Sequence, residues 1–136
     1  TIHQILTLAS VIEKEGKNQD FRTISSVFYN RLNINMRLES CATGYYGVGL
    51  DFNELGIATK DVINAKNAYN TYNVNGLPIG PISLPSKNAI EAALTPDNTD
   101  YLFFLSDNQG ITYFFNNYSE HQKKQQELIA AGKWYR

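Results

Sequence analysis

The stretch LASVIEKEG, residues 8–16, decides how the chain begins to fold. Together with the apolar residues before it, this stretch forms a wide apolar stripe with the three- and four-residue spacing of a helix over residues 2–15. Gly16 follows where a capping glycine commonly ends a helix. We therefore predict a buried helix that ends near Glu15 and carries two carboxylates, Glu13 and Glu15, in its last turn.

These two carboxylates are candidate acid–base groups. Residues two apart on a helix diverge by about 200°, so Glu13 and Glu15 cannot act together on one atom. Glu15 lies nearer the helix C-terminus, where unsatisfied carbonyls disfavour a negative charge, so we expect its pKa to be raised, and further raised by burial. A carboxylic acid that stays protonated near neutral pH is a general acid. On pattern alone, a solvated helix end is the commoner explanation of Glu-Lys-Glu.

The rest of the chain predicts an α+β fold, with helices first and a hairpin late. The runs 101–105 and 111–115 are rich in β-formers, and the polar residues 106–110 between them predict a hairpin. Residues 36–55 contain three glycines and predict an irregular segment with one hairpin at most, whereas the proline- and glycine-rich residues 67–85 predict a rigid, buried loop. We predict further helices over residues 21–32 starting from Asn18, over residues 59–65, over residues 86–94, and from a capping Ser119 through Ala131.

Length, charge balance and cysteine content exclude several classes of function. The chain has 136 residues, the size of one domain, and its balance of 12 Lys+Arg against 13 Asp+Glu argues against nucleic acid as a partner. No apolar run approaches the roughly 18 to 20 residues that span a bilayer. The chain begins at Thr1, without an initiator Met, and we expect a domain excised from a longer protein. The single cysteine, Cys41, excludes an internal disulfide, and with His3 and His121 it shows no metal-ligand spacing.

A second set of residues suggests a carbohydrate cleft. Tyr69, Asn70, Thr71 and Tyr72 precede the stretch GLPIGPI at residues 76–82, which includes Pro78. Aromatic rings beside amides and hydroxyls suit sugars, which present apolar faces and hydroxyl groups. A packed loop with ordinary core tyrosines is the alternative. Glu39 and Ser40 precede Cys41, where either a substrate contact or a turn capped by side chains fits the pattern.

Taken in order, several segments resemble the YceG-like family of endolytic murein transglycosylases. The matching segments are LASVIEKE (8–15), VFYNRL (27–32), MRLES (36–40), YNTY (69–72), GLPIGPI (76–82) and residues 89–104. The resemblance covers nearly the whole chain, and the ordered set is more specific than any one segment. For the Glu-Lys-Glu and Tyr-Asn-Thr-Tyr motifs, the resemblance favours a functional role over a solvated helix end and a packed loop.

The resemblance implies a lysozyme-like catalytic domain that cleaves the MurNAc–GlcNAc β-1,4 bond of peptidoglycan and leaves 1,6-anhydro-MurNAc ends. It implies no metal or organic cofactor, and peptidoglycan synthases as candidate protein partners. It implies location at the bacterial cell membrane, outside the cytoplasm, through an upstream anchor. The resemblance assigns Glu15 as the catalytic acid, and we expect substrate contacts from Glu13, Glu39, Ser40, Tyr69, Asn70, Thr71, Tyr72 and Pro78.

One carboxyl is enough for this chemistry, whereas hydrolytic glycosidases mostly need two. Glu15 would protonate the glycosidic oxygen and then accept the proton of the C6 hydroxyl as that oxygen attacks C1. Two alternatives stay open: a hydrolysing muramidase, with Glu39 as a second carboxylate, and a glycan-binding module without turnover. The chain departs from many relatives in reading ESCATG at residues 39–44, without their Asp, and in placing Gly16 where a hydroxyl residue is common.

Overall fold

The computed structural model describes residues 1–49 and 60–134. The first helix, α1, spans Ile2–Glu15, as predicted, and Thr1 caps its N-terminus through a reciprocal capping box with Gln4. Gly16 ends the helix in an extended conformation, with φ −164°, and not in the left-handed form of a capping glycine. A Cβ at Gly16 would overlap the side chain of Ile24, so close packing of the next helix explains a glycine here.

Three helices form the core of the molecule. α2 spans Phe21–Asn33 after a short 3-10 turn, η1, over Asn18–Asp20, and α6 spans Lys87–Leu94. Both helices fall where the periodicity predicts them, but the predicted start signal Asn18 lies in η1, and Asp20 is the residue that precedes α2. Their apolar faces join that of α1 in one cluster, which includes Leu8, Ile12, Ile24, Phe28 and Ala93. This cluster fixes the direction of α1 and therefore the position of Glu15 at its end.

The prediction of an irregular segment is wrong for residues 41–47, which form helix α3, Cys41–Gly47. The two glycines that suggested turns mark close packing instead. A Cβ at Gly44 would lie 2.8 Å from Cγ1 of Val62, and a Cβ at Gly47 would overlap the side chain of Asn67. Val62 belongs to α5, Lys60–Asn64, which matches the short helix predicted near residues 59–65. Residues 36–40 and 48–49 contain no helix or strand, as predicted, and residues 50–55 of the stretch lie outside the described residues.

Residues 67–85 contain neither helix nor strand, as the prolines and glycines predict. The loop is held by Asn70, whose side chain is fully buried. Its Nδ2 donates to the carbonyl oxygens of Val62, Ile63 and Ala65 at 3.2, 3.0 and 2.7 Å, and its Oδ1 accepts from the backbone N–H of Tyr72 at 3.1 Å. The prediction that this loop is buried holds only in part, because Asn70, Thr71 and Ile82 are buried whereas Ile79 and Leu84 are exposed.

The hairpin is confirmed as β1, Phe103–Ser106, paired antiparallel with β2, Thr112–Phe115. Helix α7, Tyr118–Ala130, follows it. The predicted cap Ser119 is wrong, because Asn117 is the residue in extended conformation and its side chain accepts from the backbone N–H of Glu120. Ser119 already lies in the first turn of the helix.

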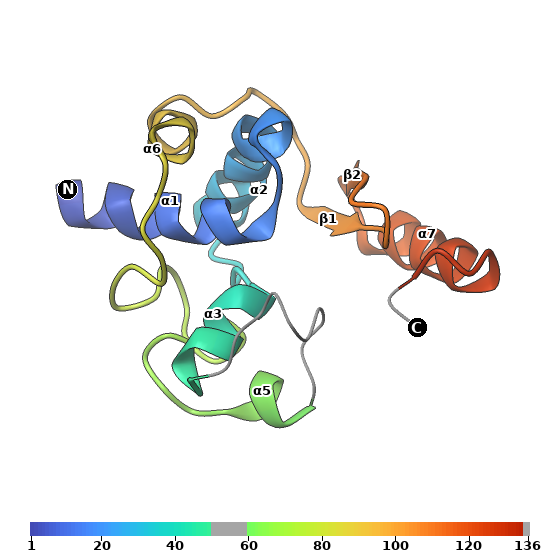
Figure 1. Ribbon diagram of the computed structural model, residues 1–136, viewed down its shortest axis with the longest axis horizontal. Coiled ribbons are helices and arrows are strands. Elements are labelled where there is room, and N and C mark those ends of the chain that lie inside the picture. Colours follow the sequence, from blue (N-terminus) through green and yellow to red (C-terminus); the bar gives the residue numbers. More distant parts are fainter. Residues whose placement is uncertain (50–59, 135–136) are drawn as a thin grey trace.

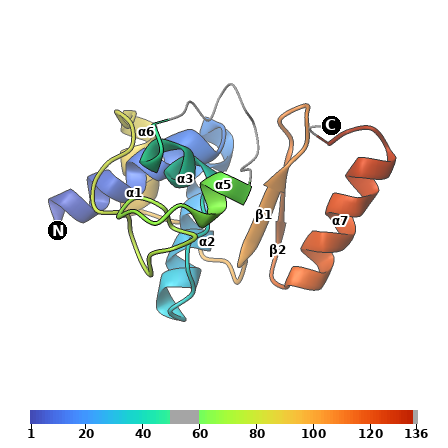
Figure 2. The same ribbon diagram turned by 90° about the horizontal axis from the view of Figure 1, so that it is seen from below.

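The architecture is a mixed α+β fold, mostly helical, with one two-stranded hairpin and a C-terminal helix. Figure 1 shows α1, α2 and α6 crossing one another in the helical body, while β1, β2 and α7 stand together at one side. Figure 2, turned by 90°, shows the hairpin between this body and α7. The C-terminal end of α1 points toward the hairpin, and the candidate site lies where these two parts meet.

Candidate active site

A cleft of about 560 Å³ lies between the helical body and the hairpin with α7. Its volume falls within the range of ~300 to 1,000 Å³ that is typical of small-molecule sites. The lining residues come from three regions of the described chain: the end of α1 with α2, the part from the segment before α3 to the loop 67–85, and the hairpin with α7. They are Lys14, Glu15, Gly16, Lys17, Phe28, Arg31, Leu38, Glu39, Cys41, Ile63, Tyr72, Phe103, Phe104, Leu105, Ser106, Gly110, Thr112, Tyr118, His121, Gln125 and Trp134.

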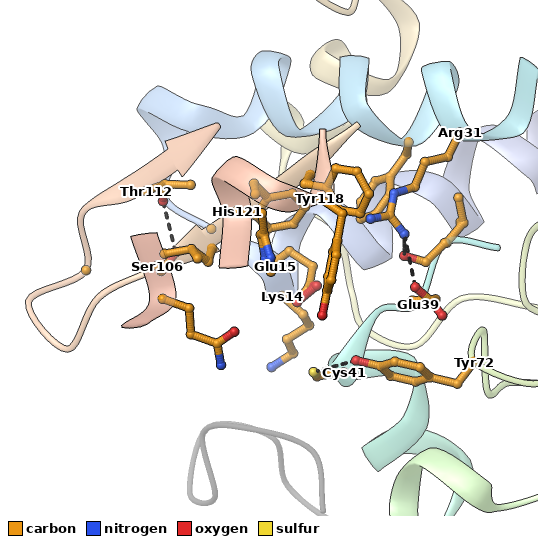
Figure 3. Close-up of a pocket in the computed structure, with 18 of the residues that line it drawn as sticks. Lys14, Glu15, Arg31, Glu39, Cys41, Tyr72, Ser106, Thr112, Tyr118 and His121 are labelled. Carbon is orange, nitrogen blue, oxygen red and sulfur yellow. Dashed lines mark hydrogen bonds and ion pairs between the residues drawn. The ribbon is translucent and has the colours of Figure 1, made fainter. Parts of the chain in front are cut away.

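Glu15 is the last residue of α1, and its carboxyl faces this cleft (Figure 3). Burial raises the pKa of Glu15 to about 7, although a hydrogen bond from Ser40 and the charge of Arg31 both act to lower it. Ser40 Oγ donates to Glu15 Oε2 at 3.2 Å. The raised pKa predicted from the helix end is confirmed, with burial as its main cause. Glu15 is therefore partly protonated at neutral pH, as a general acid must be.

Ser40 is held rigidly by the loop 67–85. Its backbone N–H donates to Thr71 Oγ1 at 2.8 Å, and its carbonyl accepts from Thr43 Oγ1 at 2.8 Å. The hydroxyls of Thr43 and Thr71 lie 2.8 Å apart, and both side chains are fully buried. Thr71 therefore supports the partner of Glu15 from the interior, and its own side chain does not line the cleft.

Glu39 brings a second carboxylate into the same cleft. Its backbone adopts a left-handed conformation, φ 51°, which costs a non-glycine residue on the order of 1–3 kcal/mol. The backbone N–H of Glu39 donates to the carbonyl of Thr71 at 3.3 Å, which helps to hold that conformation. Its side chain is 47% exposed and pairs with Arg31, with 3.7 Å between Oε1 and Nη1.

Arg31 of α2 ties three segments together beneath the cleft. Its side chain is buried, its Nε donates to the carbonyl of Leu102 at 2.7 Å, and its Nη1 donates to the carbonyls of Arg37 and Leu38 at 3.0 and 3.1 Å. The guanidinium carbon also lies 5.0 Å from the centre of the Phe103 ring. The sequence offered one signal for this role, because Arg31 is a charged residue on the apolar face of its helix.

Tyr72 completes the side of the cleft that carries Glu39. Its phenol oxygen lies 3.2 Å from Cys41 Sγ. Burial, followed by the neighbouring Cys41, Glu15 and Glu39, raises the pKa of Tyr72, so its hydroxyl stays neutral and available as a donor. Of the residues predicted to bind substrate, Glu39 and Tyr72 line the cleft together with Glu15, and Ser40 bonds to Glu15.

The other predicted binding residues lie elsewhere. Glu13 Oε1 accepts from the backbone N–H of Ser86 at 2.6 Å, at the start of α6. Tyr69 packs edge-on against Tyr46, with 4.8 Å between ring centres. Pro78 lines a different cavity, which also contains His3. Asn70 is buried and bonded to backbone, as described above.

Sequence reasoning missed the wall of the cleft that α7 provides. His121 lines the cleft with Tyr118, and the two rings stack with centres 5.7 Å apart. Burial lowers the pKa of His121, and its Nδ1 is buried without a hydrogen-bond partner in the described structure. The i, i+3 spacing of Tyr118 and His121 is the signal that places both on one face of the helix.

In the described ranges, 1–49 and 60–134, no group of three or more His, Cys, Asp and Glu side chains could hold a metal ion. Among the helices of these same residues, none has the length and apolar character required to cross a membrane.

A protonatable carboxyl in an open cleft that is lined by aromatic rings, held by a hydrogen bond from a hydroxyl, is suited to acid–base catalysis. Residues 1–127 match the YceG-like family, and the chain belongs to this family. The chain is 39% identical over 132 residues to an endolytic murein transglycosylase of Bacillus subtilis strain 168. It is 37% identical over 133 residues to one of Streptococcus pneumoniae serotype 2.

The fold is also found in a solved structure. A crystal structure of a yceG-like protein from Listeria monocytogenes matches 90% of this chain with a TM-score of 0.85 and 42% sequence identity. These proteins are longer than the chain, which covers 36% of the Bacillus protein, 24% of the Streptococcus protein and 40% of the Listeria chain. The similarity therefore concerns one part of each relative.

Proposed function

We propose that this chain is an endolytic lytic transglycosylase that cleaves the MurNAc–GlcNAc β-1,4 bond within peptidoglycan strands. The observation that carries the proposal is Glu15, whose burial in the cleft raises its pKa to about 7. Support comes from two relatives, 39% and 37% identical, that are named endolytic murein transglycosylase. We also propose that the chain is one catalytic domain of the lysozyme-like type, acting on the outer face of the cytoplasmic membrane, where its substrate lies.

The reaction needs one protein carboxyl that serves twice. Glu15 gives its proton to the glycosidic oxygen, the bond from that oxygen to C1 of MurNAc breaks, and the GlcNAc hydroxyl leaves. The acetamido group of the substrate stabilises the positive charge at C1. The C6 hydroxyl of the same sugar then attacks C1 and gives its proton to the ionised Glu15. The new C6–O–C1 bond closes the anhydro ring, and the acid is restored without water.

The surrounding residues support these two steps differently. Ser40 donates to Glu15 Oε2 and so stabilises the ionised state that exists between the steps. The neutral hydroxyl of Tyr72 offers a hydrogen bond to the substrate, and the rings of Tyr118 and His121 offer faces for pyranose stacking. Thr71 and Asn70 act through the loop, by fixing Ser40 and Tyr72.

A hydrolysing muramidase is the second candidate, and Glu39 favours it. Glu39 is a partly exposed carboxylate in the same cleft as Glu15, as a water-activating base must be. Its pairing with buried Arg31 argues for a structural role, because the two side chains together hold the segment before α3. The products distinguish the two reactions.

The decisive experiment is mass spectrometry of the products from uncrosslinked glycan strands. Strands incubated with the chain should acquire 1,6-anhydro-MurNAc ends, and Glu15→Gln should abolish them. Glu91→Gln is the matched control, because Glu91 is exposed on α6 and does not line the cleft. Hydrated reducing ends would establish the muramidase instead. Binding without either product, in the chain and in the longer protein alike, would contradict both catalytic proposals.

A further inference from the structure

Two lysines line the cleft beside Glu15 and have no assigned role. Lys14 is half-buried and Lys17 is exposed, and both belong to the cleft lining. The ion pairs found within residues 1–49 and 60–134 involve other side chains, so neither ammonium group is neutralised there. A Cβ built on Gly110 would lie 2.7 Å from Lys17 Nζ, which places that ammonium group against the turn of the hairpin.

Neutral hydrogen-bonding groups also line the cleft. The hydroxyls of Ser106 and Thr112 lie 3.0 Å apart across the hairpin, and Gln125 lines the cleft from α7. Figure 3 shows Ser106 and Thr112 on one side of Glu15, with Glu39 and Tyr72 on the opposite side. We call Lys14 and Lys17, which both line this cleft, the lysine subsite.

The acidic and basic side chains that line the cleft differ in how far their charges are neutralised. Its acidic lining residues in the described structure are Glu15 and Glu39, and Glu39 is paired with Arg31. Glu15 is held largely protonated by burial below neutral pH. The lysine subsite is thus cationic without a counter-ion in the described part of the chain, an arrangement suited to an anionic group of the ligand.

We infer that the lysine subsite binds the carboxylates of the peptide stem carried by MurNAc, so that peptide-bearing strands are the preferred substrate. This inference rests on the proposed function. The sugar backbone of peptidoglycan offers no charge once its lactyl group is joined to the peptide, whereas the stem carries free carboxylates. Lysines are mobile point charges, which suits a flexible peptide better than a fixed bidentate clamp would.

The kinetic test compares peptide-bearing strands with strands stripped of peptide. The ratio of kcat/KM for the two substrates should fall about fivefold in the double variant Lys14→Gln/Lys17→Gln, as expected for two partly exposed charge pairs. The change should lie mainly in KM for the peptide-bearing strands. Salt should lower the ratio for the unchanged chain, since exposed charges are screened.

The matched control is Lys87→Gln/Lys123→Gln, two exposed lysines outside the cleft lining, and it should keep the ratio. An unaltered ratio in the Lys14→Gln/Lys17→Gln variant would overturn the inference.

A binding test separates this inference from the proposed function. The Glu15→Gln variant is titrated with the MurNAc–GlcNAc disaccharide alone, with its free-acid peptide form, and with the same peptide form amidated at its carboxylates. The free-acid form should bind several-fold more tightly than the other two, and adding Lys14→Gln/Lys17→Gln should remove that difference. Equal affinity for the free-acid and amidated forms would overturn the carboxylate subsite, whether or not the chain shows turnover.

Discussion

At the scale of single residues, the sequence predicts the direction of the pKa shift of Glu15, whereas the tertiary structure determines its main cause. The helix period and the position at the helix end predict a carboxyl with a raised pKa, and the structure confirms that direction. The cause that dominates is burial, which depends on residues that arrive later in the chain. The sequence did not predict that Arg31 and His121 line the cleft, because their contacts are made with residues distant in sequence. Arg31 bonds to the carbonyl of Leu102, and the ring of His121 packs against Phe103.

The raised pKa of Glu15 predicts a pH dependence of stability. A carboxyl whose pKa rises from 4.5 when unfolded to about 7 when folded binds its proton more tightly in the folded state. The free energy of unfolding should therefore decrease as pH rises from about 4.5 to about 7, by about 3 kcal/mol for this group. Denaturant unfolding across that pH range measures the decrease. Glu15→Gln should flatten this part of the curve, and Glu91→Gln should leave it in place.

Ser40 provides a second test at the residue scale, on activity. The proposed first step needs protonated Glu15, so kcat/KM should fall as pH rises through about 7. The hydrogen bond from Ser40 lowers the pKa of Glu15, so Ser40→Ala should raise that pKa and move the basic limb to higher pH. Its maximal rate should also drop, because the ionised intermediate state loses a donor. Ser119→Ala, an exposed change on α7, serves as control. A basic limb that does not move would show that Glu15 is not the titrating acid.

At the scale of elements, periodicity predicted the helices with clear apolar faces and failed where glycines have a packing role. α1, α2 and α6 each carry an apolar stripe, and each lies within a few residues of its predicted bounds. α3 was missed because glycine within a short segment usually signals a turn. Its two glycines instead allow α5 and Asn67 to approach, a requirement that only the tertiary structure reveals.

This packing can be tested at Gly44. A methyl group there would lie 2.8 Å from Cγ1 of Val62, so Gly44→Ala should lower the free energy of unfolding by about 1–3 kcal/mol despite the better helix propensity of alanine. Val62→Ala removes the opposing methyl group, and the double variant should lose less than the sum of the single losses. Urea unfolding of the four proteins measures this coupling. Strict additivity would show that the two side chains do not meet.

At the scale of the whole molecule, the cleft exists because the hairpin and α7 are held against the helical body. The sequence predicted both parts, but nothing in its periodicity places one relative to the other. Arg31 supplies much of that placement, through its bond to the carbonyl of Leu102 and its position over the ring of Phe103. The same side chain fixes the segment that carries Glu39 and Ser40. One buried cation thus joins both walls of the cleft.

Arg31→Lys should therefore loosen the cleft without unfolding the helical core. Lysine keeps the charge but lacks the planar fork that reaches three carbonyls at once, so at least one buried acceptor loses its partner, at a cost of about 1–3 kcal/mol. Hydrogen exchange should accelerate in β1, β2 and α7, while α1 and α6 remain protected.

Arg22→Lys is the matched control, because Arg22 is an exposed residue of α2 that bonds to the carbonyl of Thr95 outside the cleft. Turnover of glycan strands should fall with the Arg31 change alone, since Glu15 keeps its helix but loses the wall opposite it. Exchange that accelerates equally in every element would assign Arg31 to global stability and not to the placement of the hairpin.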